Sequence, residues 1–271
     1  MFEEYWCRML VKIQGLFSDY DGTLSPLEVT RADAVVSRRL KGLLTKVGER
    51  VPIGIVTTKD MDFVRERVPF AHGIAAVSGL EMQVGNRSYV DKRVQGHNKK
   101  LEETYREVLP RILQLHDAIV VERKTTEKGE LIGFCVDWRM SQDWVGVGQK
   151  VRPILRECRR AGLFVAESES SPFANIYVTE VDKGKAFLKL RSELSVTGPV
   201  IYLGDSEADN PAFKVAEISI GINHHRRIPE LQSQYILEFI ELEGFMIKLL
   251  DADLEFNEEM VELNPNYSPA H

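Results

Sequence analysis

Two apolar segments, far apart in the chain, each lead directly into acidic residues. The run VKIQGLFS, residues 11–18, precedes Asp19 and Asp21, and the run PVIYLG, residues 199–204, precedes Asp205. Short apolar runs of this kind are typical of buried parallel strands. Because the carboxyl ends of parallel strands open onto the ligand crevice of such a sheet, the sequence predicts an α/β fold with carboxylates gathered at one edge.

The pattern of apolar residues also predicts an inserted second domain. Strands and helices alternate near both ends of the chain, which is typical of a parallel sheet flanked by helices. Between residues 80 and 174 the pattern changes to strand pairs and two long amphipathic helices. We therefore expect a Rossmann-like core built from residues 1–79 and 175–271, and an α+β cap built from residues 80–174.

Composition excludes several classes of protein. The net charge is -6 and Lys and Arg form no long runs, so we expect no nucleic-acid partner. No apolar stretch approaches the roughly 20 residues that span a bilayer, so we expect no membrane association. The three cysteines, Cys7, Cys135 and Cys158, are an odd and widely spaced set, which is typical of a reducing compartment. We expect a cytoplasmic protein.

The segment Asp19-Tyr20-Asp21-Gly22-Thr23 carries two carboxylates at a strand end. A carboxylate can attack phosphorus, and a second carboxyl group nearby can protonate the leaving oxygen and later deprotonate water. Asp19 fits the first role and Asp21 the second, while Gly22 allows a sharp turn beside them. The alternative is an acidic turn without chemistry, because Asp and Gly are common turn residues.

The segment Gly204-Asp205-Ser206-Glu207-Ala208-Asp209 brings a third acid to the same sheet edge. Mg²⁺ prefers oxygen ligands and is often held by one or two carboxylates together with a substrate phosphate. Asp19, Asp205 and the backbone carbonyl of Asp21 form a suitable set, and we expect Asp209 to orient its neighbours. Asp and Ser also favour helix N-caps, and both interpretations can hold together.

Phosphate ligands are expected at two further strand and helix ends. Thr57, with Thr58 beside it, ends the second strand, and Lys183 begins a helix, with Lys185 as a close alternative. Hydroxyl, ammonium and helix N-terminal amide groups are suitable phosphate donors. As isolated residues they would be assigned to structure or surface, but their order with the acidic segments favours phosphate binding.

These four motifs in this order, DxDGT, a hydroxyl residue, a helix-opening lysine and GDxxxD, resemble the haloacid dehalogenase phosphatases over nearly the whole chain. The resemblance implies a Mg²⁺-dependent phosphomonoester hydrolase acting on a small phosphorylated metabolite. It implies that Asp19 is the nucleophile, Asp21 the acid and base, Thr57 and Lys183 phosphate ligands, and Asp205 a metal ligand.

The inserted segment resembles the caps of sugar phosphatases, and the trehalose-6-phosphate phosphatases look nearest. The residues that carry this resemblance are DYDGTLSP, Gly79-Leu80-Glu81 and the stretch from Val121 to Arg139. The resemblance implies sugar contacts in the cap, at Glu81, Glu122, Lys124 and Arg139. Solvated strand charges are the alternative interpretation of these four residues.

The chain departs from the trehalose-phosphatase pattern at Asp137, where a histidine is expected, and at Asn175, near an expected acid. The segments GDSEADNPAF and DKGKA also resemble mannosyl-3-phosphoglycerate phosphatases, which are the first alternative. A phosphomutase and a non-catalytic regulatory module are further alternatives on the same fold.

Overall fold

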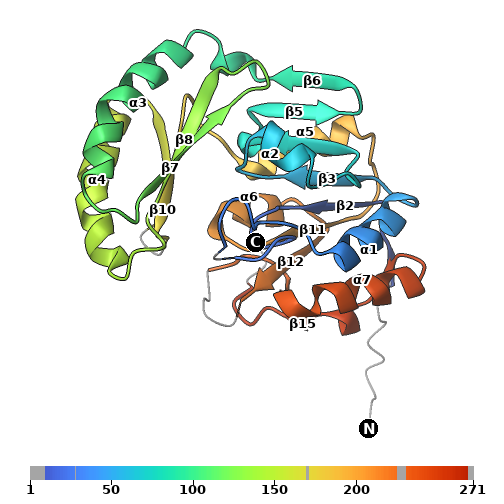
Figure 1. Ribbon diagram of the computed structural model, residues 1–271. Helices are drawn as coiled ribbons and strands as arrows, with labels where there is room; N and C mark the ends of the chain where they lie inside the picture. The colour runs from blue at the N-terminus through green and yellow to red at the C-terminus, as the bar shows by residue number, and fades with distance from the viewer. Residues whose placement is uncertain (1–9, 28, 169–170, 225–229, 268–271) are drawn as a thin grey trace.

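The computed structural model describes residues 10–27, 29–168, 171–224 and 230–267, which form two main sheets (Figure 1). We call the nine-stranded sheet the core sheet and the four-stranded sheet the cap sheet. The strands of the core sheet are, in spatial order, β15 (Glu262–Leu263), β13 (Tyr235–Glu238), β12 (Ile218–Asn223), β11 (Val200–Gly204), β2 (Gly15–Ser18), β3 (Ile53–Val56), β4 (Gly73–Ala76), β5 (Glu81–Val84) and β6 (Arg87–Val90).

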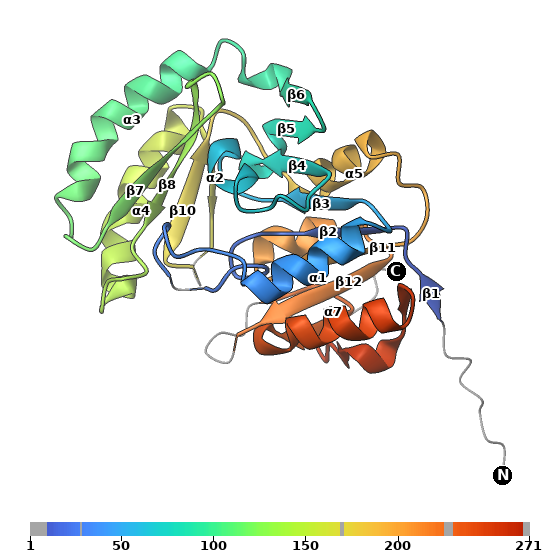
Figure 2. The same ribbon diagram turned by 45° about the vertical axis from the view of Figure 1, so that its right-hand side comes forward.

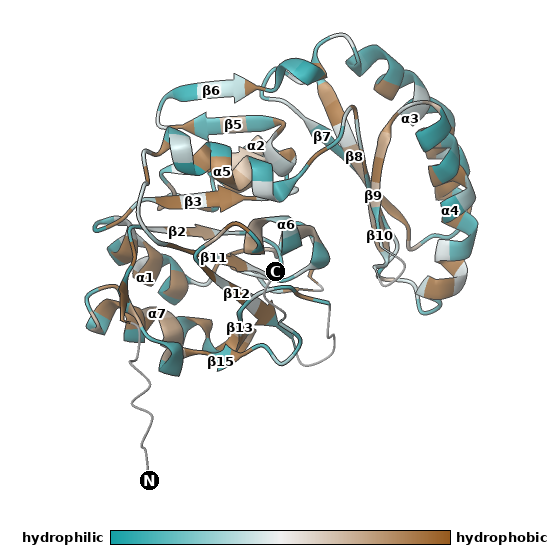
Figure 3. Ribbon diagram, turned by 180° about the vertical axis from the view of Figure 1, so that it is seen from behind, coloured by the Kyte–Doolittle hydropathy of each residue, from teal (hydrophilic) through white to brown (hydrophobic). Residues whose placement is uncertain are grey.

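The middle of the core sheet is parallel and is covered by helices on both faces, as the sequence predicted. Strands β13 to β4 run parallel, and β15, β5 and β6 add antiparallel edges. Helices α1 (Arg38–Gly48) and α7 (Leu242–Asp251) pack together on one side (Figure 2), and α5 (Lys183–Glu193) and α6 (Asn210–Phe213) lie on the other (Figure 3). Consecutive residues of β2 therefore join different apolar clusters, Leu16 with Phe245 of α7 and Phe17 with Phe187 of α5. The expected α/β fold class is confirmed.

The cap sheet is antiparallel and has helices on one face. Its strands, in spatial order, are β7 (Val120–Thr125), β8 (Leu131–Asp137), β10 (Phe173–Tyr177) and β9 (Phe164–Glu167), and its helices are α3 (Asn98–Leu113) and α4 (Trp144–Arg160). Phe134 of β8 packs edge-on against Tyr105 of α3, with ring centroids 5.2 Å apart. Figure 3 shows the hydrophobic colour concentrated in central core strands such as β3, and both colours on α4.

The other face of the cap sheet carries polar residues. Side chains alternate between the two faces of a strand, and directly opposed residues share a face. Glu122, Cys135 and Asn175 are opposed across β7, β8 and β10, and all three line a cavity together with Asp19 and Asp205 of the core. The polar face of the cap sheet therefore lies over the acidic edge of the core sheet.

Two strand assignments differ from the expectation. Strands β5 and β6, placed by sequence in the cap, belong to the core sheet, and β10, of which residues 175–177 were placed in the core, pairs between β8 and β9 of the cap sheet. An apolar pattern determines which face of a strand is buried, but it does not specify the sheet that the strand joins. The sequence boundaries at residues 80 and 174 therefore do not coincide with the boundaries of the sheets.

Smaller features complete the description. Strands β1 (Val11–Lys12) and β14 (Glu255–Phe256) form a separate two-stranded sheet, and the short helix α2 (Met61–Arg65) follows β3. Cys135 and Cys158 are buried and free, while Cys7 lies outside the described residues. Among the helices that the structure describes, none has the length and apolar content needed to cross a membrane.

Candidate active site

Asp19 lies at the carboxyl end of β2, between β3 and β11, and is almost fully buried, with 5% of its surface exposed. Its Oδ1 accepts a hydrogen bond of 2.6 Å from the backbone N–H of Tyr20. The Nζ atom of Lys183 lies 2.7 Å from Asp19 Oδ2 and 2.7 Å from Asp209 Oδ1. One buried ammonium group therefore joins two of the acids that the sequence predicted at this edge.

Lys183, and not Lys185, reaches the acids. It is the first residue of α5, whose N-cap residue Asp182 accepts a hydrogen bond from the backbone N–H of Lys185. The side chain of Lys183 is buried, whereas that of Lys185 is exposed. The cap at Asp182 starts the helix at the position from which the Lys183 side chain enters the acidic cluster.

Asp19, Asp205 and Asp209 form a compact oxygen cluster. One carboxylate oxygen from each lies within 4.8 Å of the others. Asp209 is already engaged, because it accepts hydrogen bonds from Lys183, Tyr202 and Ser206 at 2.7, 2.9 and 3.1 Å. Three protein donors thus hold Asp209. Asp205, together with the Asp19 carboxylate that Lys183 and the Tyr20 N–H hold in place, could contribute oxygen atoms to a bound cation.

Gly22 is required for the approach of Asp205. Its φ of 73° lies in the left-handed region that favours glycine. A Cβ atom added at this position would lie 2.1 Å from Asp205 Oδ2. Glycine thus allows the loop that carries Asp19 and Asp21 to pass directly against the third carboxylate.

The electrostatics of the cluster favour a bound cation. Burial raises the pKa of Asp19 to about 7, although Lys183 opposes the shift. Burial and the neighbouring charge of Asp19 raise the pKa of Asp205 well above its ordinary value. Among the described residues, Lys183 is the one ammonium group paired with this cluster of three carboxyl groups. When ionised, the cluster therefore carries an excess of negative charge, and its oxygen atoms suit a hard divalent ion such as Mg²⁺.

The neighbouring residues Thr57 and Thr58 have different surroundings in the structure. Thr57 is fully buried, and its Oγ1 accepts a 3.2 Å hydrogen bond from the backbone N–H of Lys59. Thr58 lines the cavity above Asp19, and its backbone carbonyl accepts a 2.5 Å hydrogen bond from Lys124. Of the two predicted phosphate ligands, only Thr58 lines this cavity.

Two adjoining cavities lie between core and cap. The inner cavity, about 90 Å³, contains Asp19, Asp21, Lys183 and Asp205 in its wall. The outer cavity, about 260 Å³, extends between the core segment 26–34 and the cap. They share the lining residues Asp21, Leu27, Lys59, Glu122, Asp137 and Arg139.

Three of the four predicted cap residues reach these cavities. Glu122 pairs with Arg31 at 3.0 Å and with Lys59 at 3.3 Å, and Arg139 pairs with Asp137 at 2.7 Å. Lys124 is buried, and burial lowers its pKa to about 8. Asn175, where the chain departs from the trehalose-phosphatase pattern, lies in the wall of the inner cavity. Its side-chain Oδ1 is buried and has no hydrogen-bond partner within the described part of the chain.

Glu81 lies apart from these residues and lines neither cavity. It is 2% exposed, and its Oε1 accepts a 3.0 Å hydrogen bond from the backbone N–H of Glu127 in the loop between β7 and β8. Burial raises its pKa to about 7. The structure therefore places Glu81 at a contact between the core sheet and the cap, not at the predicted sugar site.

Sequence reasoning missed two cationic residues of the site, Arg31 and Lys59. Lys59 Nζ lies 3.6 Å from Asp21 Oδ2, and Arg31 links Glu122 to Asp60. Lys59 could have been predicted from the sequence, because it directly follows Thr57 and Thr58 at a strand end. Arg31 lies outside the helices and strands, so it belongs to no periodic pattern from which a role in the site could have been predicted.

No family model matches the chain. Sequence comparison nevertheless finds relatives that are named trehalose-phosphate phosphatases. A probable trehalose-phosphate phosphatase D of Arabidopsis thaliana is 29% identical over 226 residues, covering 79% of this chain and 60% of that protein. A probable trehalose-phosphate phosphatase 4 of Oryza sativa subsp. japonica is 28% identical over 224 residues, covering 79% and 58%. The chain thus spans about 60% of the length of these curated relatives.

Solved structures with the same arrangement cover almost the whole of both chains. The C-terminal domain of trehalose-6-phosphate phosphatase from C. albicans has a TM-score of 0.70 at 15% identity, covering 88% of this chain and 93% of that one. A haloacid dehalogenase-like hydrolase from Bacteroides thetaiotaomicron has a TM-score of 0.61 at 14% identity, covering 88% and 100%. This chain has the haloacid dehalogenase-type fold. The resemblance to trehalose-6-phosphate phosphatases that the sequence indicated is confirmed by both comparisons. Within this fold the acids of the chain lie at the ends of β2 and β11.

Proposed function

We propose that this chain is a cytoplasmic phosphomonoester hydrolase that uses Asp19 as its nucleophile. The observation that carries the proposal is the placement of Asp19 beside Lys183 and Asp205, in the floor of a cavity that Asp21 also lines. A carboxylate oxygen of Asp19 attacks phosphorus, the bond from phosphorus to the leaving oxygen breaks, and Asp21 gives that oxygen a proton. Water then attacks the aspartyl phosphate, Asp21 takes a proton from it, and phosphate leaves with Asp19 regenerated.

The remaining residues have supporting roles in this proposal. Asp19, Asp205 and the backbone carbonyl of Asp21 would hold Mg²⁺, which supplies positive charge against the phosphoryl oxygens. Lys183 holds Asp19 in place and, with Thr58, presents donors to the phosphate. Thr57 supports the turn beneath Thr58 through its hydrogen bond with the N–H of Lys59. Asp209 fixes Lys183 and Ser206.

We propose a sugar phosphate as the substrate, with trehalose 6-phosphate as the first candidate. The relatives and the solved structure that are named trehalose-phosphate phosphatases support this choice. The charged side chains that line the outer cavity also support it, because the three cations Arg31, Lys59 and Arg139 are balanced by the three acids Asp21, Glu122 and Asp137. A balanced lining favours a neutral sugar over the sugar acid of a mannosyl-3-phosphoglycerate phosphatase, since an added carboxylate would find no unpaired cation there.

The experiment that tests the proposal measures phosphate release from p-nitrophenyl phosphate and trehalose 6-phosphate, with Mg²⁺ and with EDTA. We expect turnover with Mg²⁺, loss of turnover with EDTA, and loss of at least about 10³-fold in Asp19→Asn, because an amide is not nucleophilic. Asp117→Asn, an exposed substitution in the cap, is the matched control. A near-normal rate in Asp19→Asn would overturn the mechanism.

A further inference from the structure

The inner cavity is too small to hold a phosphorylated sugar by itself. It measures about 90 Å³, whereas sites for small molecules begin at about 300 Å³. The outer cavity adds about 260 Å³, and the two share Asp21, Lys59 and Glu122 in their walls. A phosphoryl group at Asp19 would therefore direct the rest of the substrate past Asp21 into the outer cavity.

Under the proposed function the outer cavity receives the leaving group, so we call it the leaving-group subsite. We propose that Arg31 determines which leaving groups this subsite accepts. The inference rests on the proposed phosphatase function. Arg31 comes from the core segment 26–34, and the opposite wall of the cavity includes Val120 and Glu122 of β7 in the cap sheet. The subsite thus exists only where core and cap meet.

Arg31 is held in a fixed position over this cavity. Its Nη2 donates to Asp60 Oδ2 at 2.5 Å, and its Nη1 donates to Glu122 Oε2 at 3.0 Å. The guanidinium group also lies over the ring of Phe63, 4.3 Å from the ring centroid. A guanidinium has five N–H donors, so these two contacts leave donors for a ligand, and 37% of the side chain is exposed.

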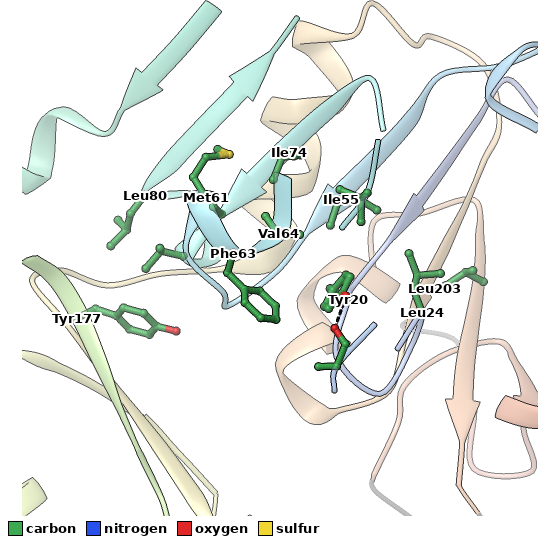
Figure 4. Close-up of a cluster of buried hydrophobic side chains, with 14 of the residues drawn as sticks. Tyr20, Leu24, Ile55, Met61, Phe63, Val64, Ile74, Leu80, Tyr177 and Leu203 are labelled. Carbon is green, nitrogen blue, oxygen red and sulfur yellow. Dashed lines mark hydrogen bonds between the residues drawn. The ribbon is translucent and has the colours of Figure 1, made fainter. Parts of the chain in front are cut away.

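The segment that carries Arg31 is also anchored. The hydroxyl of Tyr20, between Asp19 and Asp21, donates a 2.6 Å hydrogen bond to the carbonyl of Ala34. The rings of Tyr20 and Phe63 meet edge-on with centroids 5.8 Å apart (Figure 4). Arg31 therefore needs little reorganisation to meet a ligand, and such preorganisation favours selective binding.

The lining specifies a neutral polyhydroxyl group. Arg31 donates hydrogen bonds and Glu122 accepts them, so the pair matches sugar hydroxyls. Val29, Val120 and Met140 provide an apolar wall that suits the C–H face of a sugar ring. Because the subsite lies beyond Asp21 as seen from Asp19, we assign it to the part of a substrate that follows the phosphorylated ring, such as the second ring of a disaccharide phosphate.

The test compares kcat/KM for trehalose 6-phosphate with kcat/KM for glucose 6-phosphate. In Arg31→Met we expect the ratio of the two to fall about 10- to 100-fold, the effect of losing a charge-assisted hydrogen bond. Arg31→Lys should recover part of the loss, because lysine restores the positive charge and part of the hydrogen bonding. Arg67→Met is the matched control, because Arg67 also stacks on Phe63, at 3.9 Å, but lines neither cavity.

Each result has a distinct meaning. An equal fall for both sugar phosphates would give Arg31 a purely structural role and overturn the subsite, as would an unchanged ratio. Turnover of p-nitrophenyl phosphate with neither sugar phosphate accepted would also overturn it. If the wild-type chain releases no phosphate from any of the three compounds, the proposed function itself fails, and the subsite fails with it.

Discussion

At the scale of single residues, the stability of the site depends on Lys183, which is enclosed with two carboxylates. Removing one partner of a buried ion pair leaves an uncompensated charge, at a cost of about 3–5 kcal/mol. We expect Lys183→Met to lower the free energy of unfolding by about that amount without added metal, and to abolish turnover. Urea denaturation checks the first effect. Lys185→Met, on the exposed face of α5, should change neither quantity, and equal behaviour of the two variants would contradict the assignment.

Asn175 offers a second prediction at this scale. The buried Oδ1 atom of its side-chain amide has no hydrogen-bond partner among the residues that the structure describes, and an unsatisfied buried acceptor costs about 1–3 kcal/mol. We expect Asn175→Leu to raise the melting temperature of the free protein and to raise KM for sugar phosphates, because leucine removes both the buried polar atom and its contact with the substrate. Thermal unfolding and steady-state kinetics measure the two effects. An unchanged KM would show that no substrate donor meets this atom.

The residues of the site differ in how far the sequence predicted them. Asp19, Asp21 and Asp205 were accessible because each follows an apolar strand, and parallel strands bring their carboxyl ends together. Arg31 was not accessible, because its partner Glu122 lies 91 positions away in the chain and no local pattern connects them. Local sequence patterns therefore predict residues at the ends of strands. A contact between a core loop and the cap depends on tertiary packing, which local patterns do not show.

At the scale of secondary-structure elements, β5 carries a carboxyl group whose ionisation opposes folding. Burial raises the pKa of Glu81 to about 7 in the folded chain, from an ordinary value of 4.5. Between these values the unfolded chain has lost the proton and the folded chain retains it, so stability falls as pH rises from about 4.5 to about 7 and then levels off.

Glu81→Gln should remove this pH dependence. We expect the variant to be more stable than the wild type at pH 8, by up to about 3 kcal/mol, and the difference to vanish below pH 4.5. The glutamine carbonyl keeps the hydrogen bond from the Glu127 N–H. Urea denaturation from pH 4 to pH 8 measures the effect. A constant difference across this range would mean that Glu81 does not titrate as described.

The sequence predicted which segments form strands better than it predicted which strands pair with one another. The sequence indicated a strand pair around residues 82–90 and a strand at residues 176–179. It assigned the pair to the cap and the later strand to the core, whereas β5 and β6 join the core sheet and β10 joins the cap sheet. Strands β4 and β5 are antiparallel and are joined by the turn Val77–Gly79. Gly79 has a φ of 92°, and a Cβ atom added there would lie 2.6 Å from the Cβ of Ala186 in α5. This turn requires close contact between Gly79 and a helix about 100 residues later in the chain. The apolar pattern of a single strand carries no information about such a contact.

At the scale of the whole molecule, the proposed Mg²⁺ site predicts a link between metal binding and stability. A ligand that binds only the folded state stabilises it, by about 2.7 kcal/mol at one hundred times its Kd. We expect Mg²⁺ to raise the melting temperature more at pH 8 than at pH 5, since Asp19, with a pKa of about 7, must lose its proton to bind. Thermal unfolding with MgCl₂, against NaCl at equal ionic strength, measures the shift. Asp205→Asn should reduce it, and an equal shift in the variant would contradict the site.

The strand that carries Asp19 has neighbours from distant parts of the chain. β2 pairs with β3 on one side and with β11, which begins at Val200, on the other. At a synthesis rate of roughly 5–20 residues per second, the second neighbour emerges on the order of ten seconds after the first. During that interval one edge of β2 has unpaired backbone groups, which are a template for association with other chains. The strand that leads to Asp19, the proposed nucleophile, is therefore also an edge at which a newly made chain is exposed to aggregation.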